Sequence, residues 1–196
     1  MSADGYRTTV DAVALAAAAK TGKRAAVLDV GIGAGGVALA MLDDNPGLKI
    51  TGIDVSADML TRAMLNAAAN DREMELLQAD IFDFRTGRLF DAVVTNPPYF
   101  SGTPRADAAH HNADIYKWTA ACAKRVKARG MLYMIVAPGV LDKAVAALHD
   151  SKFGEISIRP LATERGIERV VVSARLGVRT PAKIFFPVDL NADKKI

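Results

Sequence analysis

Four short apolar runs, each ending near an acidic or amide residue, constrain the fold of this chain more than any other feature. Helix-like segments separate the runs, and this alternation is typical of a parallel β-sheet with helices on both faces. Ligands of such sheets bind beyond the carboxyl ends of the strands. We therefore expect an α/β fold with a polar ligand-binding edge. The runs and their polar residues are 25–30 with Asp29, 48–54 with Asp54, 74–80 with Asp80, and 90–96 with Asn96.

Three further apolar runs complete the expected sheet. Residues 131–137 predict a fifth strand, and the runs at 153–161 and 168–176 should pair as an antiparallel hairpin because little sequence separates them. A closing hairpin favours a seven-stranded, Rossmann-like, mostly parallel sheet over the six strands of a dehydrogenase. The helices that we expect are 10–20, a stretch ending near 44, a helix from Ser56 as N-cap to about 69, then 112–129 and 138–150.

The length of 196 residues fits one domain. We divide it into an N-terminal lid and helix segment 1–22, a catalytic core 23–180 and a C-terminal extension 181–196. The lone Cys122 cannot form an internal disulfide, and the sequence shows no signal peptide or membrane-spanning run. We therefore expect a cytoplasmic protein that does not enter a membrane.

The two halves of the chain differ in charge. Residues 1–98 hold 9 Lys and Arg against 13 Asp and Glu, whereas residues 99–196 hold 16 against 9. An acidic first half suits a neutral or cationic cofactor. The basic second half suits a polyanion, because phosphate contacts supply much of the affinity for nucleic acids.

A glycine-rich loop follows the first predicted strand. Gly31, Gly33 and Gly35 lie between Asp29 and the next helix. Glycine adopts positive φ and lets the backbone approach a ligand, and the helix N-terminus adds unpaired N–H groups. The spacing of Gly31, Gly33 and Gly36 also fits a dinucleotide fingerprint, with Asp54 at the distance of a ribose-binding acid. The loop alone therefore leaves NAD and S-adenosylmethionine (SAM) open.

With SAM, each strand end has an expected role. The loop and Asp29 would hold the amino-acid part, and Asp54 with the adjacent Val55 would hold the ribose hydroxyls. Asp80 would accept from the adenine amino group, with Ile81 against the ring. All of these residues, together with Asn96, are candidate cofactor-binding residues.

The segment Asn96-Pro97-Pro98-Tyr99 indicates the chemistry. Two prolines fix an extended backbone, so the Asn96 side-chain oxygen and the Pro97 carbonyl can point into one small site. Two acceptors that bind the hydrogens of a ring-conjugated NH₂ group would free its delocalised lone pair for attack on a methyl group. Positioning and electrostatics then replace a strong base. Tyr99 offers a flat face to a planar substrate, as aromatic side chains do for RNA bases.

The loop, the strand-end acids and this segment together resemble the class I SAM-dependent N-methyltransferases. More narrowly, Gly5-Tyr6-Arg7 with Asp11-Ala12 ahead of the first strand, followed by Asn-Pro-Pro-Tyr-Phe, resembles the bacterial valine-tRNA adenine-N6 methyltransferases. That resemblance implies N6 methylation of adenosine 37 in tRNA. It also implies that Tyr6, Arg7 and Asp11 form a lid over cofactor and substrate.

Several basic or aromatic residues are candidates for substrate binding. The stretch after Tyr99 would overhang the site, and the turn between the last two strands should lie at the same edge. His110 and His111 have no acidic or cysteine residue at a metal-ligand spacing, so we expect no bound metal ion. Trp118 should lie in the core. The candidate substrate-binding residues are Tyr99, Phe100, Arg105, His110, His111 and Arg165.

Other substrates remain open at this point. The same Asn-Pro-Pro-Tyr element serves enzymes that methylate a glutamine amide of translation release factors, DNA adenine, or guanine in ribosomal RNA. The segment 5–12 and the basic second half favour RNA, most of all tRNA. An NAD enzyme and a non-catalytic RNA-binding protein that keeps the fold are further alternatives.

Overall fold

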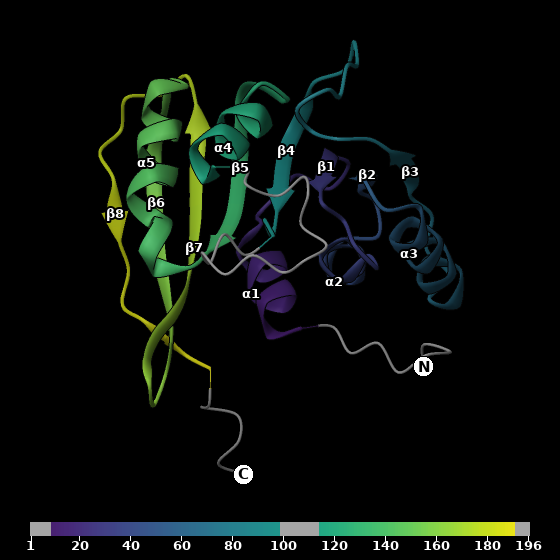
Figure 1. Cartoon of the computed structure of the whole chain (residues 1–196), viewed down its shortest axis with the longest axis horizontal. Coiled ribbons are helices and arrows are strands. Elements are labelled where there is room, and N and C mark those ends of the chain that lie inside the picture. Colours follow the sequence, from purple (N-terminus) through teal and green to yellow (C-terminus); the bar gives the residue numbers. More distant parts are fainter. Residues whose placement is uncertain (1–8, 99–113, 191–196) are drawn as a thin grey trace.

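The computed structural model describes residues 9–98 and 114–190, which form one sheet between two helical layers (Figure 1). The strand order is β3-β2-β1-β4-β5-β7-β6-β8, and β9 pairs with β6. The strands are β1 (Ala26–Val30), β2 (Lys49–Asp54), β3 (Glu75–Gln78), β4 (Phe90–Thr95), β5 (Val126–Val136), β6 (Phe153–Thr163), β7 (Gly166–Leu176), β8 (Lys183–Ile184) and β9 (Val188–Asp189). The helices are α1 (Val10–Ala18), α2 (Gly36–Asp44), α3 (Ala57–Ala69), α4 (Ile115–Ala123), the short 3₁₀ helix η1 (Pro138–Val140) and α5 (Leu141–Asp150).

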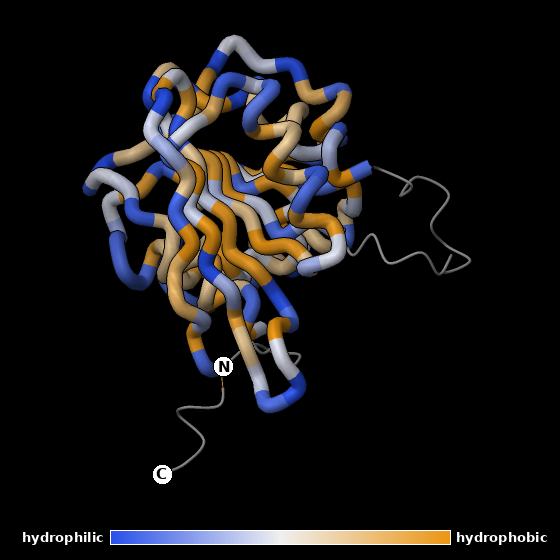
Figure 2. The backbone as a smooth tube through the Cα atoms, turned by 90° about the vertical axis from the view of Figure 1, so that its left-hand side faces the viewer, coloured by the Kyte–Doolittle hydropathy of each residue, from blue (hydrophilic) through white to orange (hydrophobic). Residues whose placement is uncertain are grey.

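The sheet separates two apolar cores, and apolar strands run through the middle of the molecule (Figure 2). Leu15 of α1 and Met41 of α2 pack with Val27 on one face, and Leu60 of α3 joins this cluster. On the other face, α4 and α5 cover a second cluster that includes the fully buried Leu132. Each parallel strand is apolar on both sides because helices cover both of its faces. The polar ligand site must therefore lie at a strand end.

The expected α/β class, the mostly parallel sheet and the C-terminal hairpin are confirmed. The strands β1 to β5 are parallel to one another, and β7 is antiparallel to both β5 and β6. The Ser56 N-cap is also confirmed, since its hydroxyl accepts a 3.3 Å hydrogen bond from the Met59 N–H. The sheet has two more strands than expected, the two-residue β8 and β9 in the C-terminal extension.

The helix expected over 112–129 is wrong in its second half. α4 ends at Ala123, and β5 begins at Val126. Residues 126–130 join β5 because β5 pairs with β4, and this pairing overrides their helical propensity. The register of the pair shifts between Phe90 and Ala92 of β4. Gly130 makes the irregularity possible, because an added Cβ there would lie 2.9 Å from the Asp91 carbonyl oxygen.

No helix within the two described ranges has the length and apolar character needed to cross a bilayer.

The hydroxyl of Tyr133 joins the sheet to the chain that follows α1. Tyr133 is only 3% exposed, and its hydroxyl donates a 2.7 Å hydrogen bond to the Lys20 carbonyl. We expect Tyr133→Phe to lower the free energy of unfolding by about 1 kcal/mol, because the carbonyl loses its partner. Urea unfolding measures this. The control is Tyr116→Phe, whose hydroxyl bonds Asp150 at the surface and whose loss should change stability by less than about 0.5 kcal/mol. Equal effects of the two changes would contradict the prediction.

Candidate functional site

The glycine loop turns sharply between β1 and α2. Gly31, Gly33 and Gly35 have φ values of 71°, 55° and 89°, in the left-handed region that favours glycine. The N–H groups of Gly31 and Ile32 donate to the Ile53 carbonyl at 2.9 and 3.0 Å, which holds the loop against the end of β2. The sequence therefore predicted both the position of this loop and its need for glycine.

Asp54 closes the loop from the neighbouring strand. One of its carboxylate oxygens accepts from the Gly33 N–H at 2.9 Å, and the other accepts from the Ser56 N–H at 2.9 Å. Val55, beside it, is 49% exposed. The acid at the end of β2 and the glycine loop after β1 thus form one unit at the carboxyl edge of the sheet.

Asp29 is an ionisable group in the core beneath this unit. It is 1% exposed, and its Oδ2 atom has no hydrogen-bond partner among the described residues. Burial raises the pKa of the Asp29 carboxyl to about 7; the Ala38 backbone opposes this rise and the charge of Asp54 adds to it. Two neighbouring carboxyl groups, one of them with an oxygen that has no described partner, suit a cationic ligand at this edge.

The third strand supplies the remaining predicted cofactor residues. β3 ends at Gln78, two residues earlier than expected, so Asp80 and Ile81 lie in the following turn. Asp80 is exposed and accepts from the Phe82 N–H at 2.9 Å. Ile81 is 3% exposed and packs in the core. Their assignments to adenine stay predictions.

A buried threonine connects the cofactor edge to the next strand. The Thr95 hydroxyl donates to the Val30 carbonyl at 2.9 Å and accepts from the Trp118 indole N–H at 3.1 Å. Trp118 also lies beside Gly31, and its ring meets Phe82 edge-on with 6.0 Å between centroids. Trp118 is 8% exposed, so its predicted place in the core is confirmed.

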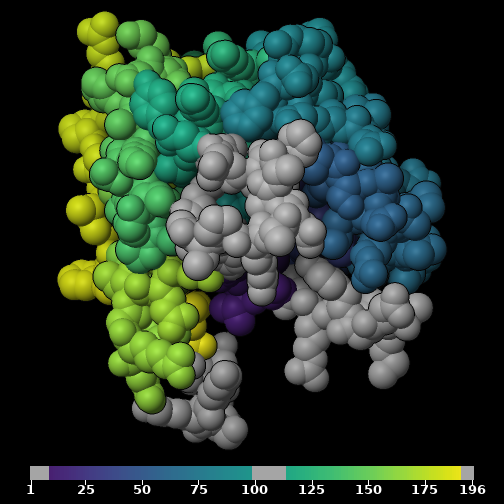
Figure 3. Space-filling view, viewed as in Figure 1, coloured from purple at the N-terminus to yellow at the C-terminus, as the bar shows by residue number. Residues whose placement is uncertain are grey.

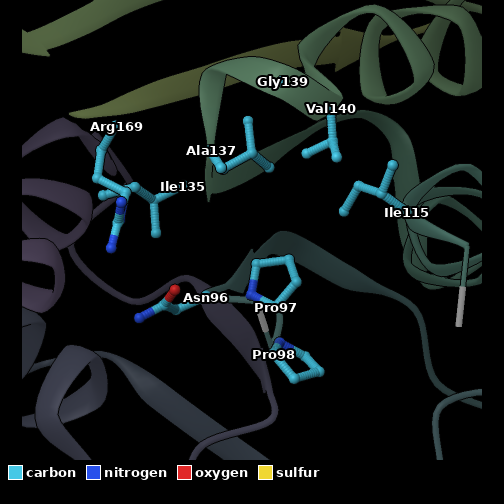
Figure 4. A pocket seen from close by; sticks show the side chains of 10 residues that line it. Asn96, Pro97, Pro98, Ile115, Ile135, Ala137, Gly139, Val140 and Arg169 are labelled. Atoms are coloured by element: carbon cyan, nitrogen blue, oxygen red, sulfur yellow. The ribbon is translucent and has the colours of Figure 1, made fainter. Parts of the chain in front are cut away.

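Asn96, Pro97 and Pro98 leave β4 and border a pocket of about 300 Å³ (Figure 4). Pro97 is buried, and Asn96 and Pro98 are half-buried. The rest of the pocket wall is apolar except for one arginine from β7. These other lining residues are Ile115, Ile135, Val136, Ala137, Gly139, Val140 and Arg169.

Sequence reasoning missed most of this pocket wall. Arg169 had no motif around it, and the apolar residues from α4, β5 and η1 read only as core. Asp11, predicted as a lid residue, lies in α1, where its Oδ2 accepts a 3.1 Å hydrogen bond from the Arg169 Nε–H. No local pattern could join residues 158 positions apart.

Other predicted substrate residues fall in different places. Arg165 is exposed in the turn of the β6–β7 hairpin, and its backbone N–H donates to the Thr163 hydroxyl at 3.2 Å. Figure 3 shows this hairpin projecting at the lower left of the molecule. Several candidates lie outside the described residues, namely Tyr6, Arg7, Tyr99, Phe100, Arg105, His110 and His111. Within the described ranges, no group of three His, Cys, Asp or Glu side chains could hold a metal ion.

A family comparison identifies the fold and its chemistry. Residues 9–157 match the sequence model of the methyltransferase small domain. This chain belongs to that family. The predicted methyltransferase fold and the predicted methyltransferase class are thereby confirmed.

Curated relatives of the chain act on different substrates. It is 38% identical over 93 residues to ribosomal RNA small subunit methyltransferase C of Shewanella amazonensis, 39% over 74 residues to the release factor glutamine methyltransferase of Koribacter versatilis, and 35% over 102 residues to the tRNA1(Val) (adenine(37)-N6)-methyltransferase of Flavobacteriaceae bacterium. These matches cover 46%, 37% and 50% of this chain. They cover 27%, 26% and 44% of the relatives, so the chain spans less than half of each.

Solved structures share the fold at low sequence identity. A predicted O-methyltransferase, Atu636 of Agrobacterium tumefaciens, superposes with a TM-score of 0.76 at 21% identity, over 93% of this chain and 90% of that one. The 16S rRNA N2 G1207 methyltransferase of T. thermophilus, solved with AdoMet and guanosine, gives 0.67 at 21% identity over 88% and 44%.

The residues present fit SAM on their own evidence. The glycines of the loop have left-handed backbone conformations and no side chains that would obstruct a ligand. The Asp29 oxygen that has no described partner is buried near Asp54. SAM is cationic at sulfur and at its amino group, which matches this acidic edge. We expect Gly31, Gly33, Asp29 and Asp54 to hold it.

The buried Asp29 should make stability depend on pH. Its folded pKa of about 7 exceeds the unfolded value of 3.8, so between these values the folded chain retains a proton that the unfolded chain has lost. Stability is therefore highest below this window and falls as pH rises through it. Relative to Asp29→Asn, we expect the wild type to lose on the order of 1 kcal/mol per pH unit from about pH 5 to about pH 7.

Urea unfolding of both proteins across this range measures the difference. Asp91→Asn is the control, because a hydrogen bond from Lys127 lowers the pKa of Asp91. The contribution of Asp91 to the free energy of unfolding is therefore constant at every pH above the pKa of Asp in the unfolded chain. Parallel stability curves for wild type and Asp29→Asn would show that the Asp29 pKa is not raised.

Proposed function

We propose that this chain methylates an exocyclic amino nitrogen, specifically adenine N6 of adenosine 37 in a tRNA. The observation that carries the proposal is the Asn96-Pro97-Pro98 corner, which opens onto an apolar pocket beside the acidic cofactor edge. β1 and β4 are adjacent parallel strands, so the glycine loop and this corner leave the same edge of the sheet. Donor and acceptor of a methyl group would meet there.

The chemistry requires little more than positioning. Bound SAM supplies a methyl group on positively charged sulfur. The Asn96 side-chain oxygen and the Pro97 carbonyl accept hydrogen bonds from the two N–H groups of the target amine, which directs its lone pair. Pro97 and Pro98 have no backbone N–H, so neither residue adds a donor that would oppose these two acceptors. Fixed dipoles in a site that excludes water supply the rate enhancement.

The pocket walls support a planar base as the target. Isoleucine and valine side chains from α4, β5 and η1 form broad apolar surfaces suited to a flat ring. The basic second half of the chain supports an RNA substrate, since residues 99–196 hold 16 Lys and Arg against 9 Asp and Glu. The similarity to a tRNA adenine-N6 enzyme supports the same substrate.

Asn96→Ala tests the acceptor role. We expect kcat to fall by at least about 100-fold, because one of two oriented acceptors is lost. The dissociation constant of SAM, measured by calorimetry, should change by less than about twofold, because the cofactor edge is intact. Asn70→Ala is the control, since the side chain of this exposed C-cap residue of α3 donates to the Asn66 carbonyl at 2.7 Å, away from the pocket. Full turnover by Asn96→Ala would show that the Asn96 side chain is not an acceptor in the reaction.

The substrate is tested by comparing three candidate substrates in separate reactions. Unmodified tRNA, ribosomal RNA and release factor are each incubated with enzyme and labelled SAM, and the products are analysed by nucleoside or peptide mass spectrometry. We expect N6-methyladenosine in tRNA, lost when position 37 is changed from adenosine. Label in a release-factor glutamine or in guanosine, with none in tRNA, would refute the proposed substrate and retain the N-methyltransferase class.

A further inference from the structure

Arg169 is the only charged side chain in the described wall of the pocket that Asn96 borders. In Figure 4 its guanidinium group and the Asn96 amide both lie at the left of the view. The Nε–H donates to Asp11 at 3.1 Å, and an Nη1–H donates to the Glu168 carbonyl at 2.8 Å. The guanidinium is therefore held in a set orientation at the pocket.

The Arg169–Asp11 pair differs from the other ion pairs formed within the described ranges. The Asp11 side chain is 16% exposed, whereas the acids of the other pairs are 43% to 67% exposed. Exposed pairs contribute little to stability and need no precise geometry. Only the Arg169–Asp11 pair has a member in the pocket wall. Its burial and its place both indicate a role in the pocket.

We propose that Arg169 is a substrate-binding residue that donates a hydrogen bond to an uncharged acceptor next to the target amino group, and that Asp11 is its positioning residue. On the proposed function, which this inference extends, the acceptor is a ring nitrogen of adenine. A guanidinium carries five N–H donors in a rigid fork and is suited to planar partners.

The ion pair selects an uncharged acceptor over a phosphate. Asp11 already balances the charge of Arg169 at 3.1 Å, so a phosphate at the guanidinium would face a carboxylate close behind it. Apart from Asn96, the other described lining residues are apolar and offer a phosphate no second cation. A neutral ring with a lone pair meets neither penalty.

Steady-state kinetics with tRNA and full-length protein test the inference. We expect Arg169→Gln to lower kcat/KM for tRNA at least tenfold, with the dissociation constant of SAM unchanged within twofold. Arg169→Lys should not restore activity, because an ammonium group lacks the planar fork. Asp11→Asn should give a smaller loss, and the double variant should be no worse than Arg169→Gln alone, because both changes act through one group.

Arg72→Gln is the matched control. It removes another Arg–Asp pair, with Asp43 at 3.2 Å, in which the arginine is 29% exposed against 28% for Arg169. Arg72 precedes the amino end of β3, at the opposite edge of the sheet. It should keep its kcat/KM for tRNA, because the pair that it removes lies outside the pocket. Equal kcat/KM for the two variants would overturn the inference.

The salt dependence of tRNA binding separates base from phosphate. Loss of a phosphate contact reduces the slope of log Kd against log salt by about one, whereas loss of a base contact leaves it unchanged. We expect an unchanged slope for Arg169→Gln, and a reduced slope would overturn the uncharged acceptor.

The proposed function can fail separately. If the wild type methylates only release factor, adenine is refuted as the target. The role of Arg169 is then tested by comparing kcat/KM of Arg169→Gln with that of the wild type on release factor. The glutamine carbonyl of that substrate is also an uncharged acceptor. A tenfold loss there supports the inference, and an unchanged ratio overturns it.

Discussion

The hydroxyl of Thr95 determines how the two halves of the site are joined. It is fully buried, donates to the Val30 carbonyl at the end of β1 and accepts from the Trp118 indole of α4. A buried hydroxyl with both roles satisfied is well fixed in space. The next residue is Asn96, and the two prolines after it have no N–H with which to anchor themselves. The direction of the corner therefore depends on the residue before it.

The same junction keeps two different electrostatic environments apart. On the β1 and β2 side, Asp29 and Asp54 raise the local negative potential, and burial holds the pKa of Asp29 near 7. On the β5 and β7 side, the one described charge in the pocket wall is balanced by Asp11. The acidic edge thus favours a cationic ligand on one side of Asn96, and the substrate proposed above would bind on the other side.

Local sequence patterns predicted the parts of the fold that neighbouring residues determine. The apolar runs gave the strands, the Ser56 cap gave the start of α3, and the short link between two β-rich runs gave the hairpin. The start of β5 was missed because residues 126–130 form a strand only by pairing with β4 across an irregular register. β8 and β9 were missed for a similar reason, since they exist only as partners of β6.

The candidate site divides in the same way. Gly31, Gly33, Asp54 and Asn96 follow directly from strand ends, because parallel strands bring their carboxyl ends to one edge. The bonds between Thr95 and Trp118 and between Asp11 and Arg169 join residues 23 and 158 positions apart, and they depend on how α1 and α4 pack on the sheet. Side-chain geometry at that range has no periodic signature in one sequence.

The range of the family match suggests how one corner can serve several substrates. The match covers residues 9–157, which include the glycine loop, the strand-end acids and the Asn-Pro-Pro corner, and it ends before Arg169. Methyl transfer needs only the cofactor edge and two acceptors, and these come from the matched part. Discrimination needs contacts to the rest of the substrate, because binding differences arise from groups that one ligand satisfies and another leaves unpaired. Of the pocket's described polar groups, Arg169 is the one that this chemistry does not require, so the role proposed for it concerns recognition of the substrate rather than methyl transfer itself.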